Sequence, residues 1–272
     1  MNSHALGMMI SSLTEEHNTK NDAFHDHRHI LLELSNNLSK VYKKDNFRGI
    51  LCDLYNDGLD DCTSQAINRY LKTQDEFGSP NKDMHTNDAE VLIRAIPLAL
   101  YIAYRPYIEK SRQYEMFEEI AKITHVHPIG VISTVIFGTL LIGYIRNDVL
   151  DDEMYLLFEY LKAQMEYRDW IHSFEAYIHL DRIRVLHREE VSNSNYVLDA
   201  LTTAMWSVTA SFDYESSKRI LEEESSNNIT RVIAGALRGA RYGYEQIDNE
   251  TKELLKDETE FFDKLIKRYE DL

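Results

Sequence analysis

The stretch Val131-Ile-Ser-Thr-Val-Ile-Phe-Gly-Thr-Leu-Leu-Ile-Gly-Tyr-Ile145 decides the fold class of this 272-residue chain. It is apolar on every side of a helix, which is typical of a helix surrounded by other helices. Its length is short for a membrane span, which needs roughly 20 apolar residues. We therefore predict a buried core helix here and no membrane partner.

The rest of the chain also favours helices. Only 10 glycines and 4 prolines occur among its 272 residues, which leaves few tight turns for a sheet. Apolar residues at helical spacing follow the core stretch at Met154, Leu157, Phe158 and Leu161. Pro97 interrupts a second apolar segment and predicts a kink or two abutting helices there. We predict an all-α chain without strands, repeats or linkers.

The charge of the chain limits its partners. Its 46 acidic and 30 basic side chains give a formal net charge of −16. Such a chain is unsuited to non-specific binding of nucleic acid or an anionic membrane, and it favours a basic protein partner. Its first residues lack the basic segment of a signal peptide, so we expect a cytoplasmic protein. Cys52 and Cys62 fit no disulfide framework or zinc spacing, and we expect small buried thiols.

Four stretches in order resemble the ADP-ribosylglycohydrolase family, whose members remove ADP-ribose from modified proteins and small molecules. The resemblance extends from about residue 84 to 248 and implies a single domain over 1–272, an orthogonal helical bundle with a divergent part at 1–84. The stretches are Leu92-Ile-Arg-Ala-Ile-Pro-Leu-Ala-Leu100, Thr124-His-Val-His-Pro128, Tyr196-Val-Leu-Asp-Ala-Leu-Thr-Thr-Ala-Met-Trp206 and Ile233-Ala-Gly-Ala-Leu-Arg-Gly-Ala-Arg-Tyr-Gly243.

The resemblance also shows what the chain lacks. Family members bind two Mg²⁺ ions through a Thr-Asp-Asp-Thr motif and a Gly-Asp-Thr-Asp-Thr motif, because Mg²⁺ prefers carboxylate oxygens. Counting back from the Ala-Gly-Ala run places the second motif on residues 225–229, and the first motif is similar in position to residues 1–4. Neither segment contains a carboxylate. The vestigial metal positions are Asn2, Ser3, His4, Ser226 and Asn228.

Glu90 is a third departure from the family pattern. It replaces the glycine of an Asn-Gly pair, at a point where the resemblance implies that backbone approaches the diphosphate of ADP-ribose. A carboxylate would repel that diphosphate. Together with the two altered motifs, this change predicts a catalytically inactive member with no catalytic residues, metal or cofactor.

An inactive scaffold of this kind resembles bacterial immunity proteins against ADP-ribosyltransferase toxins. We expect such a protein to bind its cognate toxin, which is basic, and to cover the toxin's active site. The predicted contact region is the rim of the vestigial cleft and the N-terminal part of the chain. The residues predicted to touch the partner are Asn2, His4, His25, His27, Glu90, Asn227 and Asn228.

Two other functions stay open. The chain could be an ADP-ribosyl hydrolase with a rearranged Mg²⁺ site that reverses the toxin's modification, using Asp88, Glu90 and Asp199. It could also be a regulatory pseudoenzyme that binds ADP-ribose without cleaving it.

Several histidines have both a functional and a purely structural interpretation. His25, His27 and His29 could bind a metal ion, but such a stretch of histidines is more often a polar loop. His125 and His127 stand in a turn before Pro128, where we expect hydrogen bonding and helix entry.

Overall fold

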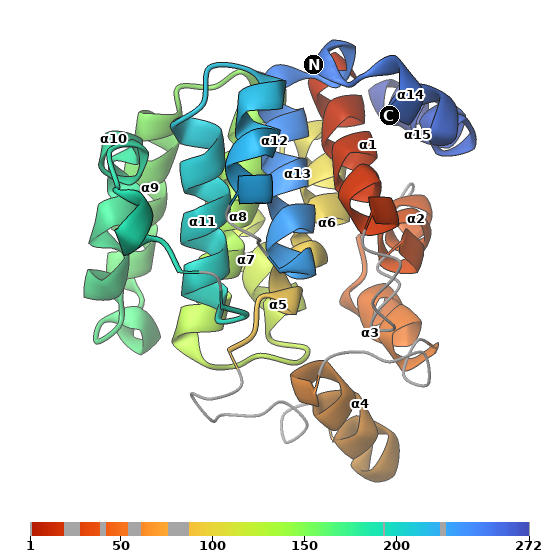
Figure 1. Cartoon of the computed structure of the whole chain (residues 1–272). Helices are drawn as coiled ribbons and strands as arrows, with labels where there is room; N and C mark the ends of the chain where they lie inside the picture. Colours follow the sequence, from red (N-terminus) through yellow and green to blue (C-terminus); the bar gives the residue numbers. More distant parts are fainter. Residues whose placement is uncertain are drawn as a thin grey trace.

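A computed structural model describes residues 2–18, 28–38, 42–53, 61–75, 87–192, 194–223 and 227–271 (Figure 1). Within these ranges the regular elements are helices and no strand occurs. Strand-like pairing is limited, in the same ranges, to an isolated antiparallel bridge between Asp88 and Tyr196. The all-α prediction is therefore confirmed.

The core helix predicted from Val131 to Ile145 is α8 (Pro128–Arg146). It packs against α6, α7, α9, α11 and α13, so neighbouring helices cover it on several sides. By length and composition α8 could cross a membrane, yet 89% of its apolar window is buried inside the protein. This burial is what a core helix requires, and it agrees with the prediction.

The segment around Pro97 forms two abutting helices, as predicted. Helix α5 (Glu90–Ile93) ends at Arg94, and α6 (Ala95–Ala103) begins directly after it. Proline has no N–H to donate to the carbonyl four residues earlier, which here belongs to Ile93. The helix therefore breaks one turn before the proline, and both pieces remain buried.

The other α-helices surround these elements. Their bounds are α2 (Arg28–Asn37), α3 (Lys44–Asp53), α4 (Asp61–Thr73), α7 (Lys110–Ala121), α9 (Leu150–Ala163), α10 (Leu180–Arg184), α11 (Val197–Thr209), α12 (Tyr214–Glu223), α14 (Asn249–Leu254) and α15 (Lys256–Glu270). Short 3₁₀ turns η3 (Met165–Tyr167), η4 (Ile171–Ile178), η5 (Arg188–Glu190) and η6 (Tyr244–Gln246) connect some of them.

Helices α1 (Asn2–Asn18) and α13 (Asn228–Tyr242) form the closest pair and lie side by side (Figure 1). A Cβ added to Gly239 would lie 2.0 Å from the carbonyl oxygen of Gly7, and one added to Gly235 would lie 2.8 Å from that of Ser11. The two backbones thus touch. Since Gly7 meets Gly239 and Ser11 meets Gly235, the helices run antiparallel.

A buried ion pair locks the same interface. Arg238 of α13 donates to the carboxylate of Glu15 on α1, and both side chains are almost fully enclosed. The guanidinium also lies 4.7 Å from the centre of the Tyr214 ring. Two buried charges are tolerated only as a pair, so this contact fixes how α1 and α13 align.

Candidate functional site

Polar side chains gather where several helices begin. The segment before α5 pairs with the segment before α11: the Ala89 N–H donates to the Asn195 carbonyl and the Val197 N–H to the Asn87 carbonyl, both at 2.9 Å. The start of α13 joins them, because the Asn227 side chain donates to the Ser194 carbonyl at 3.0 Å. Segments far apart in the sequence therefore meet at one place.

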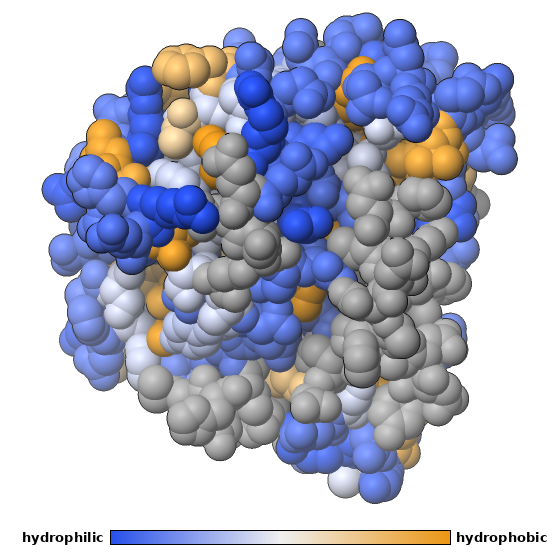
Figure 2. All heavy atoms as spheres, viewed as in Figure 1, coloured by the Kyte–Doolittle hydropathy of each residue, from blue (hydrophilic) through white to orange (hydrophobic). Residues whose placement is uncertain are grey.

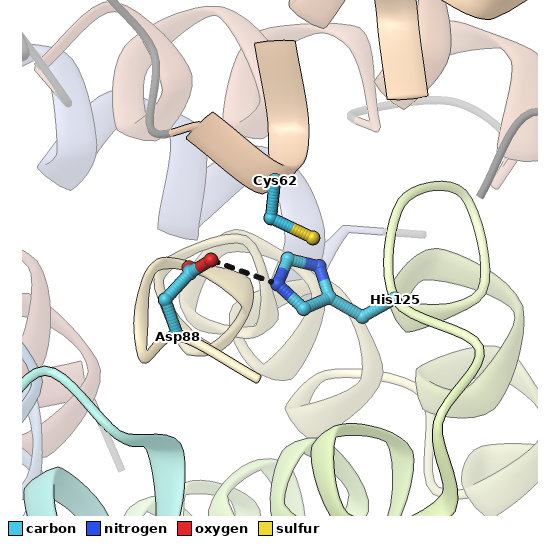
Figure 3. Close-up of side chains that lie close together, drawn as sticks. All are labelled: Cys62, Asp88 and His125. Carbon is cyan, nitrogen blue, oxygen red and sulfur yellow. Dashed lines mark hydrogen bonds and ion pairs between the residues drawn. The ribbon is translucent and has the colours of Figure 1, made fainter. Parts of the chain in front are cut away.

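Cys62, Asp88 and His125 form a compact cluster at this place (Figure 3). One potential ligand atom from each residue lies within 4.8 Å of the other two. Cys62 comes from the first turn of α4, Asp88 precedes α5, and His125 lies in the turn before α8. Cys62 and His125 are buried, whereas 21% of the Asp88 side-chain surface is exposed to solvent.

Both ring nitrogens of His125 have partners. Nε2 lies 3.3 Å from Oδ2 of Asp88, and Nδ1 lies 2.7 Å from the hydroxyl of Thr124. Burial alone would lower the pKa of His125, but the hydrogen bonds to Asp88 and Cys62 and the charge of Asp88 outweigh it and raise the pKa to about 10. This raised pKa favours the protonated imidazole, which pairs with the Asp88 carboxylate.

Arg94 supports the cluster from the α5–α6 junction. Its guanidinium donates to the hydroxyl of Thr124 at 2.7 Å and to that of Thr63 at 3.2 Å. The side chain is fully buried, and a buried N–H group without an acceptor destabilises the fold. The two hydroxyls supply acceptors for the Arg94 guanidinium. Arg94 therefore ties the first turn of α4 to the turn that carries His125.

His127 has the helix-entry role predicted for it. Its Nδ1 accepts the N–H of Ile129 at 3.3 Å, so it caps α8. Burial lowers the pKa of His127, which keeps the ring neutral and able to accept this bond. The ring also packs against Trp170, with centroids 4.5 Å apart.

Of the two predicted buried thiols, Cys62 is buried and Cys52 is only half-buried. Burial raises the pKa of the Cys52 thiol. Only Cys62 belongs to the cluster.

Residues 225–229, where we predict the second acidic motif of the family, precede and begin α13. The Asn227 side-chain oxygen is the N-cap of α13 and accepts the Thr230 N–H at 2.8 Å. Asn228 is half-buried, Ile229 is buried, and Ser226 lies outside the described residues. The two positions aligned with the family's aspartates hold Ser226 and Asn228, neither of which offers the carboxylate oxygens that Mg²⁺ prefers.

The structure does not bring the two predicted vestigial segments together. His4 contacts the Ala240 carbonyl at 2.7 Å, and the Ser3 hydroxyl accepts the Tyr244 N–H at 3.1 Å. These contacts place residues 2–4 beside the C-terminal end of α13. Twelve residues of helix separate Ala240 from Asn228, which is about 18 Å at 1.5 Å per residue. The prediction that the first motif lies at residues 1–4 is therefore wrong. This segment and residues 225–229 are too far apart to share one metal site.

The sequence contains a better counterpart for the first motif. Leu59-Asp60-Asp61-Cys62 keeps both central aspartates of Thr-Asp-Asp-Thr, and α4 begins at Asp61. Asp60 and the side chain of Asp61 lie outside the described residues, but Cys62 enters the cluster with Asp88 and His125. The signal that would have found this segment is a pair of aspartates immediately before a helical stripe.

Glu90 is not available for a partner. It is 3% exposed and belongs to α5, all four residues of which are buried. The prediction that Glu90 touches a partner is therefore wrong, because the helix directs its side chain inward. Asp88 lies beside it, and its Oδ1 accepts the Glu90 N–H at 3.2 Å. Asp199, in the first turn of α11, accepts a hydrogen bond from the hydroxyl of Ser194.

Among the remaining predicted partner residues, those that the structure describes are exposed or half-buried. Asn2 is exposed, and its side-chain oxygen accepts the Tyr104 hydroxyl at 3.0 Å. His4 is half-buried. His25, His27 and the side chain of His29 lie outside the described residues.

Comparison with known proteins gives one family. A family model described as ADP-ribosylglycohydrolase matches residues 3–272. A solved structure titled "ADP-ribosylglycohydrolase-related protein complex" is similar with a TM-score of 0.72 and 16% sequence identity, covering 99% of this chain and 98% of that one. Identity at this level shows a shared fold alone. Among curated proteins, none matches the sequence.

Proposed function

This chain belongs to the ADP-ribosylglycohydrolase family, and we propose that it binds a target protein without hydrolysing ADP-ribose. The observation that carries the proposal is the start of α13. There Ser226 and Asn228 stand at the two positions where the family has aspartates, and Asn227 between them serves as a helix cap. Without these carboxylates, the usual pair of Mg²⁺ ions would lose half of its charged ligands.

The proposed target is a bacterial ADP-ribosyltransferase toxin, whose active site this protein covers as an immunity protein. The net charge of −16 supports a basic partner, because opposite charge speeds association. Figure 2 shows a face on which hydrophilic residues predominate and apolar ones are scattered. Such a face suits recognition by charge and hydrogen bonds. Asn2, His4, Asn227 and Asn228 are the described candidates for this contact.

Stoichiometry tests the proposal directly. A basic ADP-ribosyltransferase encoded beside this gene is incubated with its substrate and increasing amounts of this protein. An occluding protein inhibits completely near one equivalent, forms a complex at micromolar concentration, and leaves ADP-ribose that is already attached in place. Absence of a complex, or removal of attached ADP-ribose by catalytic amounts of protein, contradicts the proposal.

A second candidate is a hydrolase with a rearranged site that reverses the modification. The Asp60-Asp61 pair in the sequence and the Asp88–His125 pair favour it, since they supply carboxylates and an acid–base group. Its test is release of ADP-ribose from modified arginine or RNA in the presence of Mg²⁺. Release that EDTA abolishes and that Asp61→Asn removes, while Asp169→Asn retains it, would establish the hydrolase.

A further inference from the structure

We propose that Cys62, Asp88 and His125 bind a divalent transition-metal ion of the zinc class. The three residues come from three separate segments, yet one potential ligand atom of each lies within 4.8 Å of the other two. Asp88 faces the His125 ring, and the Cys62 sulfur lies beside the same ring (Figure 3). This site is independent of the proposed binding function.

The donor types select the metal. A thiolate sulfur and an imidazole nitrogen are ligands of Zn²⁺ and its neighbours, whereas Mg²⁺ and Ca²⁺ take oxygen. A Cys62 thiolate and an Asp88 carboxylate together carry two negative charges, which balance a divalent ion beside a neutral His125. A neutral total charge suits a site in which Cys62 and His125 are buried.

One pair of proposed ligand atoms already has the spacing of a metal shell. Nε2 of His125 lies 3.3 Å from Oδ2 of Asp88. Two ligands at about 2.1 Å from a tetrahedral Zn²⁺ lie roughly 3.4 Å apart. Metal ions bind the deprotonated forms of cysteine and histidine, so binding is expected to weaken as the pH falls.

Surrounding hydrogen bonds hold the ligands in place. The Thr124 hydroxyl lies 2.7 Å from Nδ1 of His125, which leaves Nε2 for the metal. The Glu90 N–H donates to Oδ1 of Asp88 at 3.2 Å, which leaves Oδ2. Partners of this kind orient ligands in metal sites. The Asp88 side chain is 21% exposed, so it marks the side from which an ion or a fourth ligand arrives.

Cobalt titration of the reduced, full-length protein tests the site. A Co²⁺–thiolate bond absorbs in the near ultraviolet, so we expect a band that saturates at one equivalent and that Zn²⁺ removes. Mg²⁺ in excess leaves the band unchanged. A wild-type protein that shows no saturable band overturns the proposal.

Paired cysteine variants locate the ligand. Cys62→Ser is expected to abolish the band and to weaken Zn²⁺ binding at least about tenfold, whereas Cys52→Ser retains both. Asp88→Asn keeps the thiolate band but weakens binding. Circular dichroism of the metal-free variants separates loss of a ligand from loss of fold. Persistence of the band in folded Cys62→Ser, or its loss in folded Cys52→Ser, also overturns the proposal.

Discussion

The two ends of α13 are held in different ways. Near its C-terminal end, Gly239 lies so close to Gly7 of α1 that neither position has room for a side chain. At its N-terminal end, Asn227 joins α13 to the Ser194 segment through hydrogen bonds. The first end depends on shape and tolerates little added volume. The second depends on polar groups, and it is the end at which we predict that the family's metal ligands are replaced.

The largest expected effect is at the close-packed face. Arg238→Met removes the cation beside Glu15 and leaves a buried carboxylate without its partner. Breaking a buried pair in this way costs about 3–5 kcal/mol. Urea unfolding followed by circular dichroism measures the loss.

Two further variants serve as controls for Arg238→Met. Combining it with Glu15→Gln is expected to recover part of the stability, because the unpaired charge is then absent. Lys267→Met breaks an exposed ion pair with Asp263 and is expected to have no measurable effect. A loss as large in Lys267→Met as in Arg238→Met would contradict the argument.

Gly239→Ala tests the contact between the helix backbones. The added Cβ would lie 2.0 Å from the Gly7 carbonyl oxygen, so α1 must move away. Overpacking of this kind costs about 3 kcal/mol. Gly49→Ala is the matched control, because a Cβ there meets nothing within 4 Å. In that exposed helical position alanine is expected to stabilise by about 0.5–1 kcal/mol. Similar melting temperatures for the two variants would show that the helices are not in backbone contact.

The sequence predicted the packed elements well. The uninterrupted apolar stretch from Val131 to Ile145 is the central helix, and Pro97 marks a real helix break. These features depend on local composition and on the missing N–H of proline. They can therefore be seen without knowledge of the tertiary structure.

The candidate site was harder to predict. Cys62, Asp88 and His125 are distant in sequence and meet only in the folded chain, where Arg94 links the first turn of α4 to the turn that carries His125. No spacing rule marks such a cluster. Glu90 shows the same limit: its identity suggested a surface charge, and only the packing of α5 shows that it is buried.

Asn227 tests the polar end of α13. Asn227→Ala removes both the cap on Thr230 and the bond to Ser194, and loss of an N-cap costs about 1 kcal/mol. Asn227→Asp retains the cap but loses the donated bond, so it is expected to cost less. Urea unfolding of both variants separates the two contributions. An alanine variant as stable as the wild type would show that this end is not held by the cap.

The smallest expected effect concerns Asp248, which caps α14 just beyond the close-packed end of α13. Burial would raise the pKa of Asp248, but hydrogen bonds from the Thr251 N–H at 2.7 Å and the Thr251 hydroxyl at 2.8 Å outweigh burial and lower it. A carboxylate with a depressed pKa stabilises the fold above its unfolded value of about 3.9, and that stabilisation disappears as the pH falls through the lower folded value. Asp248→Asn, which keeps a neutral cap, is therefore expected to melt slightly below the wild type at pH 7, with a difference that shrinks below about pH 4 and vanishes once the pH is below the depressed folded pKa. A difference that stays constant across this range would mean that the charge of Asp248 contributes nothing to α14.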